Sequence, residues 1–228
     1  MNITTIFFDV DNTLVDHSLA EELAINKLRE VYFPKQTREE FKDIWTINTR
    51  KNWLLFEAGL LTFEQQRIQR IISVWQAFGV DLAQSKAKVV SNQYLALYEH
   101  SWKLFPSVSA TLRTLVKMKL PIGIITNGSK SQQVAKLIKM GIYPLFRKDL
   151  IVVSNAVGYT KPQIEIFLHA QHCAKTNPEN ILFVGDNITQ DIEPARSINW
   201  NTLLVDYKRE NQGRHLIHDF KEVLKFIV

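Results

Sequence analysis

The sequence predicts an α/β protein in which a doubly wound parallel sheet is interrupted, directly after its first strand, by an all-helical insertion. The second half of the chain alternates continuous apolar runs with helical periodicity, which is typical of a parallel sheet covered by helices on both faces. The region from about residue 18 to residue 98 contains no convincing strand pattern. One apolar strand precedes that region, so we expect one domain from residues 1–14 and 99–228 and a second from residues 15–98.

Composition indicates an ordinary globular protein. Of its 228 residues, 46% are hydrophobic, which is enough to form a substantial core. No run of about 18 apolar residues and no signal-peptide pattern is found, so we expect a cytoplasmic protein with no membrane partner. The net charge is +5, but acidic and basic residues are interspersed, whereas nucleic-acid binding usually needs a clustered basic face. We therefore expect a small-molecule ligand and no nucleic acid, and the protein to be a monomer or a homodimer.

The first expected strand, residues 3–8, is a run of β-branched and aromatic residues that ends abruptly in acid. Asp9 and Asp11 follow it, and Asn12 and Thr13 are residues suited to a turn. In an open parallel sheet ligands bind beyond the carboxyl ends of the strands, so both carboxylates should point into a crevice, where like charges need a cation. An isolated pair of this kind is more often a solvated acidic turn, so the interpretation depends on further matches.

Five amphipathic helices are expected in the insertion. The first is marked by Leu19, Leu23 and Leu28. The apolar stripes of the others lie in residues 41–45, 53–60, 68–75 and 89–97, and Thr62 begins the fourth helix. Helical spacing accounts for most of the aromatic residues of this region as core residues.

Strands and helices alternate after the insertion. The expected strands are residues 122–126, 150–154, 181–185 and 202–205. The expected helices are residues 107–117, a segment bearing Val134, Leu137 and Ile138 that ends at Gly141, and then residues 163–174, 189–198 and 219–227.

Polar residues stand where these strands end. The second strand ends in Thr126-Asn127, and the fourth ends in Gly185-Asp186, with Asp191 five residues later. Lys161 follows the third strand at the start of a helix. Each of these residues has an ordinary structural explanation as a turn residue, a solvated lysine or a helix N-cap. Their joint occurrence at strand ends favours a functional site.

These four signatures, in this order, resemble the motifs of the haloacid dehalogenase superfamily of hydrolases, and the resemblance spans the whole chain. The first motif, D-x-D-x-T, is matched by Asp9 to Thr13, and the others are matched by Thr126, by Lys161, and by Gly185-Asp186 through Asp191. The resemblance implies a Rossmann-like core and identifies the helical insertion as a cap domain.

The catalytic roles implied by the resemblance agree with the chemistry of the residue types. A carboxylate is already ionised at neutral pH, so Asp9 can attack phosphorus without a base and form an aspartyl-phosphate. Asp11 would be the general acid to the leaving oxygen and then the base to the hydrolytic water. Thr13 is expected to orient Asp11. Thr126, Asn127 and neighbouring backbone amides would bind phosphate oxygens.

The resemblance also implies a cofactor, Mg²⁺, bound by the carboxylates of Asp9 and Asp186 and by the backbone carbonyl of Asp11. A hard cation with oxygen ligands suits phosphate chemistry. Asp191 would orient metal-bound water or Lys161, and Lys161 would offset the negative charge of phosphate and the nucleophile.

The acid at position 11 argues against dehalogenation, because displacing halide requires no protonated leaving oxygen. We therefore expect a Mg²⁺-dependent phosphomonoester hydrolase. Residues 123–128, 133–134, 152–158 and 161–162 resemble the bacterial pyrimidine 5'-nucleotidases of the superfamily. Two alternatives stay open: a sugar-phosphate or phosphoglycolate phosphatase or phosphomutase, and a non-catalytic binding or regulatory protein on the same fold.

Specificity for the leaving group is expected in the cap, because the core motifs contact the phosphate alone. Trp53 offers a flat apolar face for a base, and Asn48 could hydrogen-bond a base edge. Arg50 and Lys51 could meet an anionic or carbonyl group of the substrate.

Overall fold

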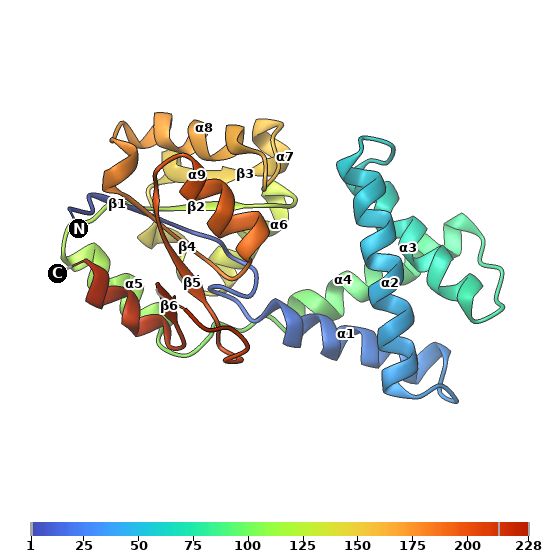
Figure 1. Ribbon diagram of the computed structural model, residues 1–228. Coiled ribbons are helices and arrows are strands. Elements are labelled where there is room, and N and C mark those ends of the chain that lie inside the picture. The colour runs from blue at the N-terminus through green and yellow to red at the C-terminus, as the bar shows by residue number, and fades with distance from the viewer. Residues whose placement is uncertain (1, 214, 228) are drawn as a thin grey trace. The chain divides into compact units, whose positions relative to one another are not determined.

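The computed structural model describes residues 2–213 and 215–227 of the chain (Figure 1). These residues form two compact units. One consists of Met1–Asp16 together with Lys103–Val228 and is called here the α/β unit. The other is His17–Trp102 and is called the helical unit.

The predicted α/β class with a parallel sheet is confirmed. Among the described residues the sheet has six strands in the order β3-β2-β1-β4-β5-β6, and every neighbouring pair is parallel. The strands are β1 (Thr5–Phe8), β2 (Ile122–Thr126), β3 (Ile151–Val153), β4 (Ile181–Gly185), β5 (Asn201–Val205) and β6 (Leu216–Ile217). The longer helices of this unit are α5 (Val108–Lys117), α6 (Lys130–Lys139), α8 (Ile164–Ala174) and α9 (Glu193–Ser197).

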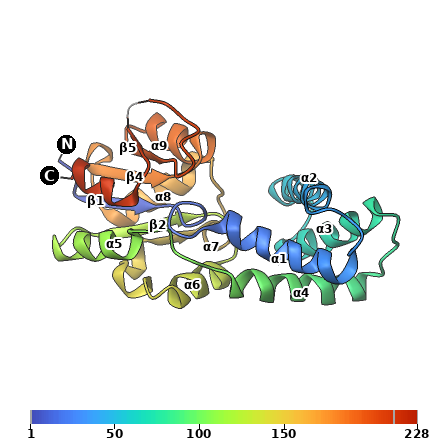
Figure 2. The same ribbon diagram turned by 90° about the horizontal axis from the view of Figure 1, so that it is seen from below.

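Strand β1 lies at the centre of the sheet and is completely buried. Its side chains alternate between two faces, because successive residues of a strand point in opposite directions. Phe7 packs against Trp200 with ring centroids 5.6 Å apart, in a core cluster that includes residues of α8 and α9. Phe8 packs against Phe220 with ring centroids 5.5 Å apart, and Phe220 belongs to the 3₁₀-helix η5 (Phe220–Phe226). Figure 2 shows α5 and α6 on one side of the sheet and α9 on the other, so the sheet is doubly wound.

The strand register brings three strands to an end at the same edge. Phe8, the last residue of β1, pairs with Ile124 of β2 and with Val184 of β4. The backbone N–H of Asp9 continues the ladder by donating to the carbonyl of Val184 at 2.9 Å. Residues directly after β1, β2 and β4 therefore meet at one edge of the sheet.

The boundaries of several expected elements differ from the structure. Strand β3 is three residues long, because residues 148–150 form a 3₁₀-turn and the short helix α7 (Ser154–Val157) follows at once. The helix expected at residues 189–198 begins as a single π-helical turn, Ile188–Ile192, before α9. The C-terminal helix is a 3₁₀-helix. Among the described residues there is also β6, a two-residue strand at the edge of the sheet beside β5, which was not predicted.

The helical unit contains four helices within residues 17–102, all of which the structure describes. They are α1 (His17–Tyr32), α2 (Arg38–Glu57), α3 (Phe63–Ala77) and α4 (Gln84–His100). The expectation of five helices was wrong, because the second and third are one continuous helix, α2. No glycine or proline interrupts residues 46–52, and the chain first leaves the helix near Gly59, which has a left-handed φ of 72°. Thr62 forms the capping box that begins α3.

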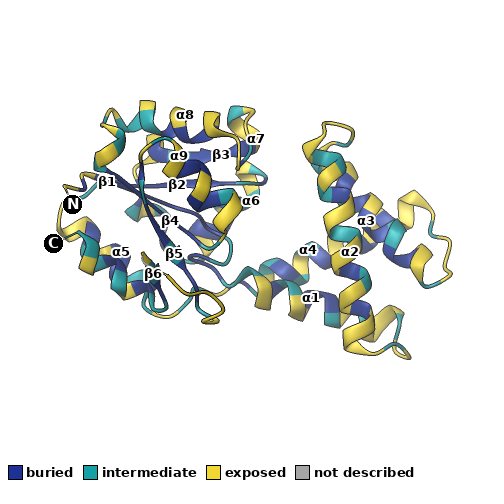
Figure 3. Ribbon diagram, in the orientation of Figure 1, coloured by how far each residue is buried: buried dark blue, intermediate teal, exposed yellow. Residues whose placement is uncertain are grey.

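The buried face of α1 differs from the expected one. Leu19 and Leu23 are 39% and 41% exposed, whereas Ala20, Ala24 and Leu28 are buried. The helix is thus rotated by about one residue from the expected stripe, because small side chains allow α4 to pack closely against it. Figure 3 shows the alternation of buried and exposed residues along each helix of this unit.

Aromatic rings form the core of the helical unit. Phe33 contacts Phe41, Trp75 and Phe78 at ring-centroid distances of 4.7 to 5.7 Å. Trp45 lies 4.7 Å from the ring of Tyr94.

Among the described residues, no helix of either unit is both long and apolar enough to span a membrane.

Candidate active site

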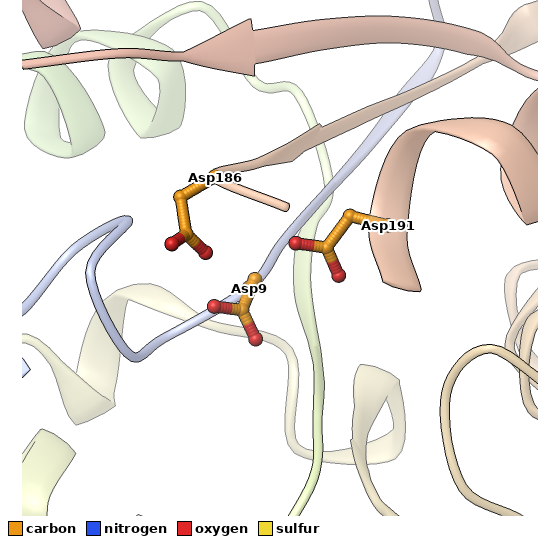
Figure 4. A group of neighbouring side chains, drawn as sticks. All are labelled: Asp9, Asp186 and Asp191. Carbon is orange, nitrogen blue, oxygen red and sulfur yellow. The ribbon is translucent and has the colours of Figure 1, made fainter. Parts of the chain in front are cut away.

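Two neighbouring strands, β1 and β4, bring three acidic residues to one edge of the sheet. Asp9 follows β1, Asp186 follows β4, and Asp191 lies in the π-helical turn after β4. One carboxylate oxygen of each lies within 4.8 Å of the others. Figure 4 shows the three side chains pointing toward one another. Three carboxylates are therefore concentrated at one point of the sheet edge.

Lys161 neutralises part of this charge. Its Nζ atom lies 2.6 Å from Asp9 Oδ1 and 2.6 Å from Asp191 Oδ1, and all three side chains are buried. Burial opposes the charged form of the lysine, but Asp191 and Asp9 outweigh it, so the pKa of Lys161 is raised. The lysine therefore stays protonated and ties the first and last motifs together.

One lysine does not compensate three carboxylates. Burial raises the pKa of Asp9 to about 7, although the charge of Lys161 opposes this rise. Burial, followed by the negative charge of Asp9, raises the pKa of Asp186 to about 8. Carboxylates that resist ionisation in this way need further positive charge. Asp9, Asp186 and Asp191 supply the hard oxygen donors that Mg²⁺ prefers, so this donor set fits the ion.

The loop after β1 is held from several sides. Asn12 adopts a left-handed φ of 61°, and the N–H groups of Leu14 and Val15 both donate to Val10 O at 2.9 Å. The hydroxyl of Thr13 donates to Asp9 Oδ2 at 3.4 Å. Thr13, four residues after Asp9, thus contacts the Asp9 carboxylate, and the expectation that it orients Asp11 stays a prediction.

Tyr207 braces the same loop from outside the motifs. Its hydroxyl donates to Thr13 O at 2.8 Å, and its ring stacks on Phe105 with centroids 3.8 Å apart. Sequence reasoning missed this residue, because nothing local to β5 indicates that a tyrosine after the strand reaches the first motif.

Thr126 ends β2 and is buried, with its hydroxyl donating to Asn127 O at 3.3 Å. The side chain of Asn127 forms a reciprocal pair with the backbone of Lys161. Its Nδ2 donates to Lys161 O at 3.0 Å, and its Oδ1 accepts from Lys161 N at 2.8 Å. Asn127 thus positions Lys161, a role that the sequence analysis did not assign to it. Ser154, also missed, accepts from Gly128 N at 3.0 Å.

Asp11 is held by helix α6. Gln133 Nε2 donates to Asp11 Oδ2 at 2.8 Å, and Lys136 Nζ forms an ion pair with Asp11 Oδ1. Sequence reasoning missed both residues, because it assigned the buried face of α6 to Val134, Leu137 and Ile138. In the structure Gln133, Lys136 and Leu137 are buried. A lysine and a glutamine three residues apart beside Leu137 were the available signal, since polar residues on a buried face are informative.

The four residues suggested for substrate recognition all lie on α2. Asn48 Nδ2 donates to Ile44 O at 2.8 Å, and Trp53 Nε1 donates to Glu57 Oε1 at 2.7 Å. Arg50 and Lys51 are exposed. Residues three apart share a helix face, so Asn48 and Lys51 lie along one line of α2 while Arg50 and Trp53 lie along another.

Comparisons with known proteins agree with this geometry. The glyceraldehyde 3-phosphate phosphatase of Methanocaldococcus jannaschii is 29% identical over 234 residues, which cover 99% of this chain and 97% of that protein. The pyrimidine 5'-nucleotidase YjjG of Escherichia coli is 29% identical over 188 residues, which cover 82% of this chain and 79% of that protein.

Structural comparison supports the same fold. The crystal structure of the HAD-hydrolase YfnB of Bacillus subtilis, bound to magnesium, superposes with a TM-score of 0.85 at 23% identity, covering 100% of this chain and 99% of that one. The family model described as haloacid dehalogenase-like hydrolase matches residues 3–199. The chain therefore belongs to the haloacid dehalogenase-like hydrolases.

Proposed function

We propose that this protein is a Mg²⁺-dependent phosphomonoester hydrolase that works through an aspartyl-phosphate on Asp9. The observation that carries the proposal is the buried bridge from Lys161 to Asp9 and Asp191, with Asp186 at the same strand edge. The names of several relatives at 28–29% identity, each a phosphatase or a nucleotidase, agree with it.

The proposed reaction has two steps. A carboxylate oxygen of Asp9 attacks phosphorus, the bond from phosphorus to the leaving oxygen breaks, and that oxygen takes a proton from Asp11. Asp11 then accepts a proton from water as the water attacks the aspartyl-phosphate. This second step releases inorganic phosphate and restores both carboxyl groups. Lys161 offsets the negative charge that phosphate brings next to Asp9.

Asp9 and Asp186, with the backbone carbonyl of Asp11, are the proposed ligands of Mg²⁺, and Asp191 is proposed to orient Lys161. The raised pKa values of Asp9 and Asp186 support a cation at this point of the structure. When bound, the ion would supply positive charge to the phosphoryl oxygens. The relative YfnB, 28% identical over 190 residues, has a crystal structure bound to magnesium, which supports the choice of ion.

The presence of Asp11 favours ester hydrolysis over dehalogenation, because only an oxygen leaving group needs a proton. A phosphomutase would use the same residues. A non-catalytic protein would not need to retain these catalytic side chains. Asp9, Asp11, Lys161 and Asp186 are all present, which favours an enzyme.

For the substrate, we place pyrimidine nucleoside 5'-monophosphates first, with the helical unit acting as a cap that contacts the leaving group. Trp53, Asn48, Arg50 and Lys51 are the proposed contact residues. Glyceraldehyde 3-phosphate is the second candidate, because the relative matched over 99% of this chain carries that activity in its name. Both relatives are 29% identical to this chain over the residues matched, so percentage identity does not rank the substrates.

A substrate panel tests the proposal. Purified protein with Mg²⁺ is incubated with UMP, dUMP, dTMP, glyceraldehyde 3-phosphate, phosphoglycolate and hexose phosphates, and free phosphate is measured. The Asp9→Asn variant, purified identically, reports any contaminating phosphatase. Hexose phosphates or phosphoglycolate clearly preferred over every pyrimidine nucleotide would remove the nucleotidase assignment. An isomeric phosphate in place of free phosphate would indicate a mutase, and no turnover of any ester would favour a binding protein.

A further inference from the structure

Helix α6 holds the carboxylate of Asp11 by both oxygens. Lys136 Nζ pairs with Oδ1, and Gln133 Nε2 donates to Oδ2 at 2.8 Å. The two donors are three residues apart in the helix and therefore project from the same face. A carboxylate bonded at both oxygens is confined to one rotamer, whereas a single bond leaves rotation about that bond.

Burial makes this contact costly to break. The side chain of Lys136 is 1% exposed, whereas that of Asp11 is 28% exposed. Taking an ammonium out of water is unfavourable unless a counter-charge compensates it, so the position of Lys136 depends on Asp11. Among the described residues the two buried lysines are Lys136 and Lys161, and each forms an ion pair with an aspartate of the first motif.

Gln133 links Asp11 to the phosphate side of the site. Its Nε2 atom also donates to Asn127 O at 3.0 Å, and the side chain of Asn127 is paired with the backbone of Lys161. Gly128 has a φ of 122°, and a Cβ there would lie 3.3 Å from Gln133 Nε2. The glycine thus leaves room for the glutamine amide. A continuous set of hydrogen bonds joins Asp11, Gln133, Asn127 and Lys161.

We propose that Lys136 and Gln133 are positioning residues that hold the Asp11 carboxylate where it exchanges a proton with the leaving oxygen. The inference rests on the proposed phosphatase function and assigns neither residue to contact with substrate. Proton transfer requires the acid within hydrogen-bond reach of the oxygen. A misplacement of about 1 Å is enough to cost on the order of a hundredfold in rate.

Two esters with different leaving groups provide the test. The leaving oxygen of an alkyl ester such as UMP needs a proton, whereas the weakly basic oxygen of p-nitrophenyl phosphate needs little protonation. Both esters form the same aspartyl-phosphate, so its hydrolysis does not distinguish them. The comparison therefore uses kcat/KM, which reports the first chemical step. The variants are Lys136→Met, Lys136→Arg and Gln133→Leu, and Lys139→Met is the control at an exposed position of the same helix.

Lys136→Met should lower kcat/KM for the alkyl ester about a hundredfold and for the aryl ester less than about tenfold, within the range of acid–base contributions. Gln133→Leu should show the same selectivity with a smaller loss. Lys136→Arg retains the positive charge and the hydrogen-bond donors, so its kcat/KM for the alkyl ester should lie within about tenfold of the parental value. Equal losses on both esters, or no loss, would overturn the positioning role.

A crystal structure of Lys136→Met separates this inference from the proposed function. The Asp11 side chain should leave its parental rotamer, and an unmoved carboxylate would overturn the inference whatever the activity. If the parent protein hydrolyses neither ester, the phosphatase proposal fails, and the rotamer of Asp11 still decides whether α6 positions it. If Lys136→Met does not fold, Gln133→Leu carries the same comparison, with Lys136→Arg as the variant that retains the charge.

Discussion

Gly185 and Asp191 are in such close contact that no side chain fits between them. A Cβ atom at position 185 would lie 2.6 Å from the carboxyl carbon of Asp191. The absence of that atom lets Asp191 pack on the end of β4, where its Oδ2 accepts from Asn187 N at 3.1 Å and its Oδ1 meets Lys161. The glycine of the last motif is therefore a steric requirement of the Asp191–Lys161 pair.

Gly185→Ala should displace Asp191 and with it Lys161. We expect a loss of about 1–3 kcal/mol in the free energy of unfolding, as for overpacking of a dense interior, and a loss of phosphatase activity of at least about tenfold. Urea denaturation and phosphate release measure the two effects. Gly213→Ala is the control for activity: a Cβ there meets no atom within 4 Å, and its φ of 149° makes alanine strained, so stability should fall while phosphatase activity is kept. Parental stability and activity in Gly185→Ala would contradict the steric argument.

Asp9→Asn should abolish turnover, because an amide is a poor nucleophile and a weaker metal ligand. We expect kcat to fall by more than about a thousandfold, as when a covalent catalyst is removed. Asp11→Asn should keep metal and substrate binding better while losing proton transfer. Steady-state kinetics and substrate titration measure this difference. Asp9→Asn activity within about tenfold of the parent would rule out Asp9 as the nucleophile.

Removal of divalent ions should abolish activity, and Mg²⁺ should restore it. Ca²⁺ takes more ligands at longer distances, so it should occupy the carboxylates and inhibit. Mn²⁺ or Co²⁺ are expected substitutes. Phosphate release after dialysis against EDTA, with each ion added back, provides the measurement. Full activity in EDTA would be incompatible with the proposed metal dependence.

Asp186→Asn should stabilise the ion-free protein near pH 8. In the folded protein the pKa of Asp9 is raised to about 7 and that of Asp186 to about 8, from an ordinary value of 3.8. Between about pH 4 and about pH 8 these two carboxyl groups therefore bind more protons in the folded state than in the unfolded state. Their contribution to the free energy of unfolding falls as pH rises through this range. The asparagine removes one such charge.

The measurement is the Tm of parent and Asp186→Asn in EDTA at pH 5 and pH 8. The variant should have the higher Tm at pH 8, and the difference should shrink at pH 5, where the parental carboxyl groups are largely protonated. Added Mg²⁺ should raise the Tm of the parent more than that of the variant. A lower Tm for the variant at pH 8 in EDTA would show that repulsion among these carboxylates is not destabilising.

Trp53→Ala should raise KM for a pyrimidine nucleotide more than for p-nitrophenyl phosphate, if the indole stacks on the base. Trp53 also packs against Phe56 at 5.2 Å and Phe63 at 6.3 Å, so the variant loses local packing. Phe63→Ala is the control for that loss. Equal KM changes for both esters, or the same change in Phe63→Ala, would indicate a structural role for Trp53.

The strands that carry the site were predictable from the sequence, as was the order of the acidic residues along the chain. The strand expected at residues 181–185 matches β4, and the one expected at 122–126 matches β2. These strands were predictable because a buried parallel strand is a continuous apolar run, which is a local property. That polar residues after such strands meet follows from the parallel direction of the sheet.

The neighbours that hold each functional group depend on how distant parts of the chain pack, which no local pattern reveals. Lys136 and Asp11 are 125 positions apart, and the apolar spacing of α6 indicated a different buried face, with Ile138 inside. Ile138 is exposed instead, because the rotation of a helix about its own axis depends on the partners it meets, and Asp11 pairs with the buried lysine. Tyr207 and Asn127 likewise acquire their roles through contacts with residues far away in the sequence.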